Sequence, residues 1–150
     1  MNRRISHLAA AWTATVFALA LPGTGSAQDD PLARAAAEKG AVVTASGLVF
    51  RSIKDGTGAA PLAADTVRVH YRGSFPDGRE FDSSHSRGQP ATFPLNRVIK
   101  CWTEGVQRMK VGGRAKLTCP AAIAYGERGA GGVIPPNAVL QFDVELLGIE

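Results

Sequence analysis

The sequence of 150 residues predicts an α+β fold in which an antiparallel sheet curls over one short helix. Two patterns predict it. Several short segments alternate apolar and polar residues with a period of two, which is typical of half-buried strands. One segment, residues 99–109, instead places its apolar side chains on a single stripe at helical spacing. A sheet and a helix that are each apolar on one side bury those sides by packing together.

Residues 1–27 have the three-part layout of a secretory signal. Arg3 and Arg4 form a positive start, residues 8–21 are uncharged and largely apolar, and residues 25–27 are small enough for a cleavage site. The apolar run is about 14 residues long, which is shorter than the ~20 that a membrane-spanning helix needs. We therefore expect a periplasmic or secreted protein without a membrane anchor; an uncleaved anchor is the less favoured alternative.

Removal of this signal changes the charge balance of the chain. It takes away two of the 17 basic residues, so that 15 basic and 13 acidic residues leave a net charge of +2. Nucleic-acid binding needs a basic stripe, and scattered charges with this small excess argue against it. Only two cysteines and two histidines remain, which are too few for a rich metal cluster. We expect neither a metal nor another cofactor.

Residues 28–45 are predicted to form a short arm before the folded domain. Asp30 and Pro31 have the residue types of a helix N-cap and first helical position. The residues from Leu32 to Lys39 favour helix, and Gly40 ends it. A helix this short is marginal on its own, so we expect either a short arm or a frayed leader.

The remaining residues, 46–150, contain the strands and the main helix. A hairpin is predicted over Val67 to Asp82, because its first arm alternates apolar and polar residues and residues 76–78 (Pro-Asp-Gly) form a turn sequence before the chain returns. The main helix is expected to end at Gly112 and Gly113. Further strands are predicted at residues 48–53, 114–119 and 140–146, and a loop rich in glycine and proline at residues 125–136.

The sequence lacks the familiar motifs of covalent and cofactor catalysis. It has no Gly-x-Ser-x-Gly, no phosphate-binding loop ending in Gly-Lys, no complete dinucleotide fingerprint and no His-Glu-x-x-His. Cys101 and Cys119 are 18 positions apart, so they are not a Cys-x-x-Cys redox pair. Two states stay open for these cysteines: a disulfide in an oxidising compartment, or two buried free thiols.

Eight aromatic residues follow the signal, and most of them fall on the inward phases of the predicted strands and helix. Taken alone, such a pattern usually means core packing. The polar residues among them indicate more, because Tyr71, Asp82 and Arg87 all lie in or next to the predicted hairpin. A buried carboxylate there would need a hydroxyl and a guanidinium as partners.

Three separated stretches of the sequence carry a family resemblance. They are residues 67–84, residues 98–109 with Trp102 and Glu104-Gly105, and residues 124–146 with Ala124-Tyr125-Gly126, Val133-Ile134-Pro135-Pro136 and Phe142-Asp143-Val144-Glu145-Leu146. In order and spacing they closely resemble the FKBP family of peptidyl-prolyl cis-trans isomerases, and the match extends from Ser46 to Glu150. The leader from Lys39 to Leu48 resembles the secreted bacterial branch. The resemblance implies five or six antiparallel strands wrapped around the helix.

The resemblance also implies an apolar pocket between the sheet and the helix. Trp102 would be its floor, Asp82 would sit at its edge, and the loop 130–134 would flank its mouth. The Tyr125 hydroxyl and the Ile99 backbone N–H would bind substrate carbonyls. The implied catalytic residues are Asp82, Tyr125, Trp102 and Phe142, and the implied substrate-binding residues are Tyr71, Phe81, Arg87, Phe93, Val98, Ile99, Val133 and Ile134. Tyr71 and Arg87 would hold Asp82.

By this resemblance the protein is expected to be a peptidyl-prolyl cis-trans isomerase that acts on proline-containing segments of folding exported proteins. Rapamycin-type macrolides are expected to bind the pocket, although Ala91 and Ala130 stand where larger residues are common. Related secreted proteins often carry a long helical dimerisation segment, and here only residues 28–45 precede the domain, so we expect a monomer. Two alternatives stay open: a proline-recognising binding module or holdase chaperone with little turnover, and a virulence or surface factor.

Overall fold

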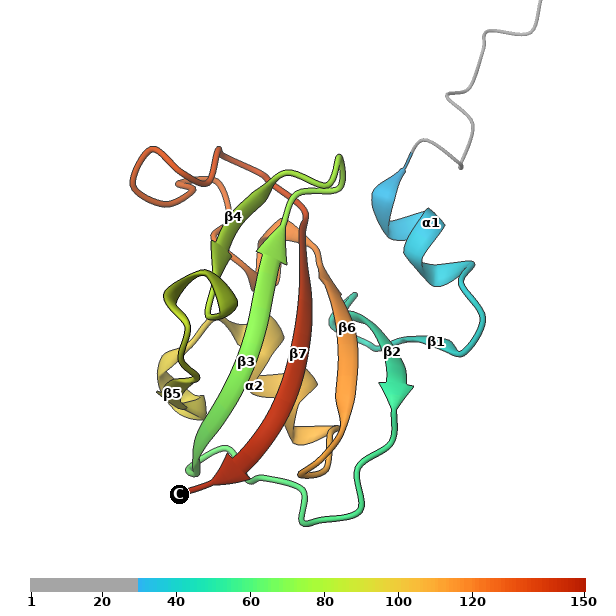
Figure 1. Cartoon of the computed structure of the whole chain (residues 1–150). Helices are drawn as coiled ribbons and strands as arrows, with labels where there is room; N and C mark the ends of the chain where they lie inside the picture. Colours follow the sequence, from blue (N-terminus) through green and yellow to red (C-terminus); the bar gives the residue numbers. More distant parts are fainter. Residues whose placement is uncertain (1–29) are drawn as a thin grey trace, which may run out of the picture.

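Within residues 30–150, seven strands form one antiparallel sheet that curves over helix α2 (Lys100–Gln107; Figure 1). The computed structural model describes residues 30–150, and the predicted signal lies outside them. The sheet order is β1-β2-β6-β7-β3-β4, with β5 also paired to β3. This confirms the predicted fold class. The strands are β1 (Ala41–Val43), β2 (Val49–Lys54), β3 (Thr66–Ser74), β4 (Glu80–Ser83), β5 (Ala91–Pro94), β6 (Arg114–Cys119) and β7 (Leu140–Ile149).

The centre of the sheet is the long antiparallel pair β3 and β7. Burial alternates along both strands, so that Val67, Val69 and Tyr71 face the core while the residues between them face outward. Their cross-strand neighbours in β7 are buried as well, with Val69 opposite Leu146 and Tyr71 opposite Val144. The period-two pattern of the sequence therefore reports directly which side of the sheet is covered.

Helix α2 (Lys100–Gln107) covers the concave side of the sheet, and it approaches β6 closely. Gly105 faces Leu117, and a Cβ added at Gly105 would lie 2.8 Å from both terminal carbons of that leucine. The same helix is joined to the end of β6 by a disulfide between Cys101 and Cys119, whose Cα atoms are 5.8 Å apart. After the helix the chain turns at Gly112, whose φ of +91° suits glycine.

The hairpin of β3 and β4 forms where the turn sequence predicts it. Gly78 has a φ of +91°, and the Asp77 carboxylate accepts a hydrogen bond from the Arg79 backbone N–H at 2.9 Å. After β4 the chain makes one turn of 3-10 helix, η1 (His85–Arg87), which folds back beside β3. This return places Arg87 close to both strands of the hairpin.

The arm before the domain is more ordered than its composition predicts. Helix α1 (Pro31–Ala36) ends three residues earlier than the predicted Lys39, and Ala35 is buried. Glu38 then bonds to Arg51 of β2 at 2.8 Å and to Lys116 of β6 at 3.1 Å. Strand β1 follows and pairs with β2, so this segment extends the sheet instead of fraying (Figure 1).

Among the described residues, no helix is long and apolar enough to cross a membrane. In the same part of the chain, no three His, Cys, Asp or Glu side chains are grouped so that they could share a metal ion.

The close approach of α2 to β6 leads to a stability prediction. Alanine favours an isolated helix over glycine by about 1 kcal/mol, but at Gly105 the new methyl group would overlap the buried Leu117. Overpacking of this kind costs about 1–3 kcal/mol, so we expect Gly105→Ala to lower the free energy of unfolding by about 1 kcal/mol in urea titrations. Gly148→Ala is the control, because its Cβ would meet nothing closer than 3.6 Å. A stabilised Gly105→Ala variant would contradict this packing.

Candidate functional site

An open cavity of about 340 Å³ lies between α2, the hairpin and the loop that follows β6. Its walls are predominantly aromatic and aliphatic, with one carboxylate and one guanidinium among them. The lining residues are Tyr71, Phe81, Asp82, Phe93, Arg97, Val98, Ile99, Trp102, Tyr125 and Phe142. Most of the implied site residues are therefore brought together from six separate segments of the chain.

The indole of Trp102 forms the floor of this cavity. It is only 4% exposed, and three aromatic rings meet it edge-on. The ring centroids lie 5.2 Å away for Tyr71, 5.6 Å for Phe93 and 5.4 Å for Phe142. Edge-to-face contacts at these distances are favourable because the positive edge of one ring meets the negative face of another. They hold the indole in one orientation beneath an open space.

Gly73 of β3 makes room for the wall beside this floor. A Cβ added at Gly73 would lie 2.6 Å from the ring of Phe81 and 3.1 Å from the ring of Phe142. These two rings are themselves in edge-on contact, with centroids 5.7 Å apart. Any side chain at Gly73 would therefore displace these two rings.

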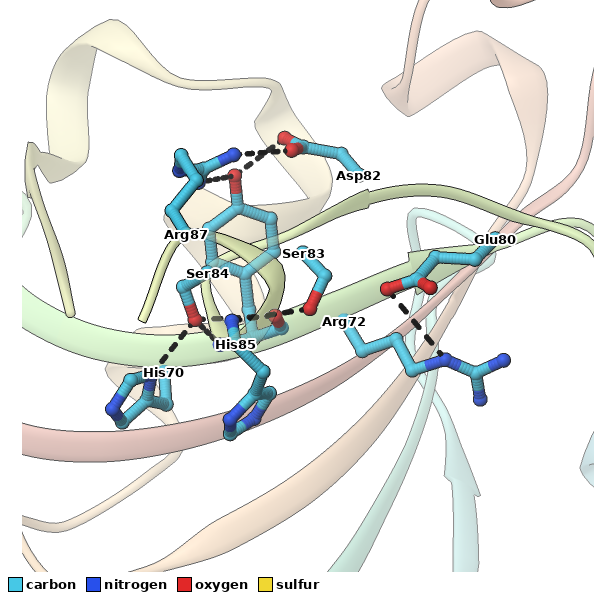
Figure 2. A network of polar contacts seen from close by, with 9 residues as sticks. His70, Arg72, Glu80, Asp82, Ser83, Ser84, His85 and Arg87 are labelled. Atoms are coloured by element: carbon cyan, nitrogen blue, oxygen red, sulfur yellow. Dashed lines mark hydrogen bonds and ion pairs between the residues drawn. The ribbon is translucent and has the colours of Figure 1, made fainter. Parts of the chain in front are cut away.

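A hydrogen-bonded group of three polar side chains stands at the edge of the cavity. The Tyr71 hydroxyl donates to Oδ2 of Asp82. Arg87 donates from Nη1 to Oδ1 of Asp82 at 2.7 Å and from Nη2 to the Tyr71 hydroxyl at 2.9 Å. Figure 2 shows Arg87 reaching from η1 toward Asp82. Each carboxylate oxygen thus has its own donor, which a partly buried charge requires.

These contacts shift the protonation of all three groups. Burial alone would raise the pKa of Asp82, but the hydrogen bonds from Tyr71 and Arg87 outweigh it and hold this pKa below its ordinary value. Burial and the bond to Asp82 raise the pKa of Tyr71. The bonds to Asp82 and Tyr71 raise the pKa of Arg87. At neutral pH the group therefore contains a carboxylate, a neutral phenol and a guanidinium.

A second set of contacts fixes the backbone of Tyr71, and no pattern in the sequence predicts it. The hydroxyl of the fully buried Ser84 accepts the Tyr71 N–H at 2.8 Å, and the Ser84 N–H donates to the Tyr71 carbonyl at 3.0 Å. Nδ1 of His70 lies 2.8 Å from the same serine hydroxyl (Figure 2). The ring of His70 stacks on that of His85 at 4.5 Å. Ser84 thereby ties η1, which carries Arg87, to the strand that carries Tyr71.

The remaining implied residues are placed less uniformly. Tyr125 lines the cavity and is 41% exposed, and the Ile99 N–H at the cavity rim has no acceptor in the described part of the chain. Val133 and Ile134 lie outside the lining: Val133 is 56% exposed to solvent and Ile134 is buried in the core. Arg97 lines the cavity although the sequence did not single it out.

An antiparallel sheet curved over one helix, with an aromatic cavity between them, can be compared with known protein families. Residues 58–147 match the family model of the FKBP-type peptidyl-prolyl cis-trans isomerases. The chain belongs to this family, which confirms the resemblance of its motifs.

Particular relatives narrow the comparison. The chain is 57% identical over 122 residues to the FKBP-type peptidyl-prolyl cis-trans isomerase FkpA of Aeromonas hydrophila, which covers 81% of this chain and 45% of that protein. The crystal structure of FkpA from Escherichia coli matches with a TM-score of 0.77 at 46% identity, over 79% of this chain and 55% of that one. A peptidyl-prolyl cis-trans isomerase structure from Pseudomonas syringae matches with a TM-score of 0.75 at 38% identity, over 80% and 88%. The chain spans about half the length of the curated relatives it matches.

The low pKa of Asp82 leads to a prediction about Arg87. In Arg87→Gln the carboxylate keeps the Tyr71 bond but loses its cation, so we expect its pKa to rise toward the ordinary value. A carbon-detected NMR titration of the Asp82 carboxyl measures this. Because the folded-state pKa lies below the unfolded one, the stabilisation from the ion pair is present above roughly pH 4 and is lost as pH falls. The free energy of unfolding of the variant should therefore fall less on acidification than that of the unmodified protein.

The chain offers a matched control for this titration. The pKa of the exposed Asp77 is lowered first by the Arg79 backbone N–H and then by the Arg79 side chain, which bonds to it at 2.8 Å and which Arg79→Gln removes. Arg79→Gln should therefore move the titration of Asp77 and leave that of Asp82 in place. An unchanged Asp82 titration in Arg87→Gln would show that the guanidinium does not set its charge.

Proposed function

We propose that this protein is a peptidyl-prolyl cis-trans isomerase that accelerates rotation about X–Pro bonds in polypeptides. The observation that carries the proposal is the aromatic cavity above Trp102, which stands open beside a fixed carboxylate. Membership of the FKBP-type family and the named activity of its relatives support it.

The reaction needs no change in covalent bonding. Rotation of a peptide bond meets a barrier of ~18–20 kcal/mol because twisting removes amide resonance. The twisted amide has less charge separation than the planar one, so it loses less solvation free energy when water is excluded. A cavity walled by Trp102, Phe142 and Phe81 therefore stabilises the twisted state relative to the planar state.

The polar groups orient the substrate in this proposal. The proline ring rests on Trp102, and the substrate carbonyls receive hydrogen bonds from the Tyr125 hydroxyl and the Ile99 N–H. Asp82 stays ionised, because its two donors are already in place, and it fixes the edge of the cavity without transferring a proton. Rapamycin-type macrolides would bind the same cavity and inhibit turnover.

The cellular setting is part of the proposal. We infer that the protein works as a monomer, without a membrane anchor, in the periplasm or outside the cell. The disulfide of Cys101 and Cys119 supports an oxidising compartment, because such bonds are rare where thiols are kept reduced. Its clients would then be exported proteins that are folding.

The proposed roles are tested by substitution. We expect Asp82→Ala and Trp102→Leu to lower kcat/KM for an X–Pro peptide at least tenfold, because each removes part of the cavity edge or floor, and we expect Tyr125→Phe to lower it less. A tenfold loss corresponds to about 1.4 kcal/mol of transition-state stabilisation. The measurement is a protease-coupled or NMR exchange assay, repeated with a rapamycin-type macrolide, which should inhibit the unmodified protein.

Phe50→Leu is the control, since this ring packs against the same core but lies outside the cavity lining. Full activity in all three site variants would refute the site assignment. Tight peptide binding by the unmodified protein without turnover would favour a proline-recognising module instead.

The disulfide makes a separate prediction. It closes a loop across 18 positions, so reduction should lower the free energy of unfolding by about 3 kcal/mol. Because both cysteines are fully buried, reduction of the disulfide should be slow unless the protein unfolds. Mass measurement after alkylation without reductant is expected to find no labelled thiol in the unfolded chain. Two labelled thiols would exclude the bond and remove this support for an oxidising compartment.

A further inference from the structure

Arg97 is the one charged residue of the cavity lining whose charge is not matched by a neighbour in the described part of the chain. Of the residues that the structure describes, Asp82 and Arg97 are the only charged ones that line the cavity. Asp82 is bonded to Arg87 at 2.7 Å, so these two charges compensate each other. None of the five ion pairs among residues 30–150 includes Arg97. The three charges around the cavity therefore leave one uncompensated positive charge.

The backbone around Arg97 places this charge beside the expected path of a substrate. Arg97 ends the short 3-10 helix η2 (Leu95–Arg97), and Val98 and Ile99 then run extended, with ψ angles of 174° and 148°. An extended chain advances about 3.3 Å per residue, so the Ile99 backbone lies about 7 Å along the chain from Arg97. A substrate residue whose carbonyl accepts the free Ile99 N–H would thus have its side chain within reach of the Arg97 guanidinium.

The groove next to this rim carries one charged residue of each sign. Val98 also lines a neighbouring open groove over the exposed face of α2, together with Lys100 and Glu104. Glu104 is already bonded to Ser46 at 2.7 Å, whereas Lys100 is in none of the ion pairs of residues 30–150. A polypeptide that leaves the cavity over Val98 therefore passes Arg97, Lys100 and Glu104, whose charges sum to +1, and Arg97 is the cation nearest the cavity.

We propose that Arg97 is a specificity-determining residue that selects substrates with an acidic side chain next to proline. This inference rests on the proposed isomerase function and names its substrate class. The carboxylate of such a substrate would pair with the Arg97 guanidinium at the solvent-exposed rim. A charge pair in such a place contributes a modest free energy of binding. Arg97 acts on binding and orientation, and the apolar cavity still performs the rotation.

The test compares peptides of the form Ala-Xaa-Pro-Ala and Ala-Ala-Pro-Xaa, with glutamate, glutamine or lysine at Xaa. We expect kcat/KM to favour glutamate over glutamine by about two- to fivefold in at least one of the two series, as for an exposed charge pair. The preference should fade at 1 M salt, where the screening length falls to about 3 Å. Arg97→Gln should bring the ratio to about one, and Arg97→Glu should reverse it in favour of lysine.

Lys54→Gln is the matched control, because it removes one positive charge from the rim of a different cavity. It should leave the glutamate preference intact. Equal kcat/KM for glutamate and glutamine in both series, or a preference that survives in Arg97→Gln, would overturn the proposal.

Peptide dissociation constants from calorimetry separate this proposal from the proposed function. Tighter binding of glutamate peptides that depends on Arg97, without turnover, would refute the isomerase and keep the role of Arg97. Turnover without any charge preference would keep the isomerase and overturn the role of Arg97. Neither turnover nor a charge preference in binding would overturn both.

Discussion

The edge-on packing of three aromatic rings around Trp102 holds an apolar surface open to solvent, and the rest of the site depends on it. An exposed apolar hollow tends to collapse, because side chains gain dispersion and hydrophobic free energy by filling it. Here Tyr71, Phe93 and Phe142 are each fixed on a strand of one sheet, so their rings cannot fold over the indole. Gly73 and Gly105 supply the close approaches that this arrangement needs.

The edge of the cavity keeps a charged carboxylate beside an apolar wall, and this requires compensating donors. Asp82 would favour its neutral form there, but Tyr71 and Arg87 donate to it and keep it ionised. The ring of Tyr71 packs against Trp102 while its hydroxyl binds Asp82. Ser84 then fixes the backbone of Tyr71 and the start of η1. Tyr71 thus contributes both to the packing of the floor and to the charge of the edge.

Much of the fold could be predicted because its long elements carry a clear period. Strand β6 has the predicted bounds, and the hairpin turn lies at Gly78 as its residue types indicate. The short strands β1 and β5 were missed, because three or four residues are too few to show alternation. The marginal helix propensity of residues 28–45 left open whether they form a short arm or a frayed leader. Burial of Ala35 and the ion pairs of Glu38 favour the ordered arm.

The sequence by itself determined which strand faces are apolar, where the turns fall and which family motifs are present, because these properties depend on neighbouring residues. Only the tertiary structure decided which side chains share the cavity. It brought Arg97 to the rim and left Val133 exposed outside it, and it joined Ser84 to the backbone of Tyr71. The physical reason is that such contacts depend on how separate segments pack in space, and no local period in the chain encodes that distance.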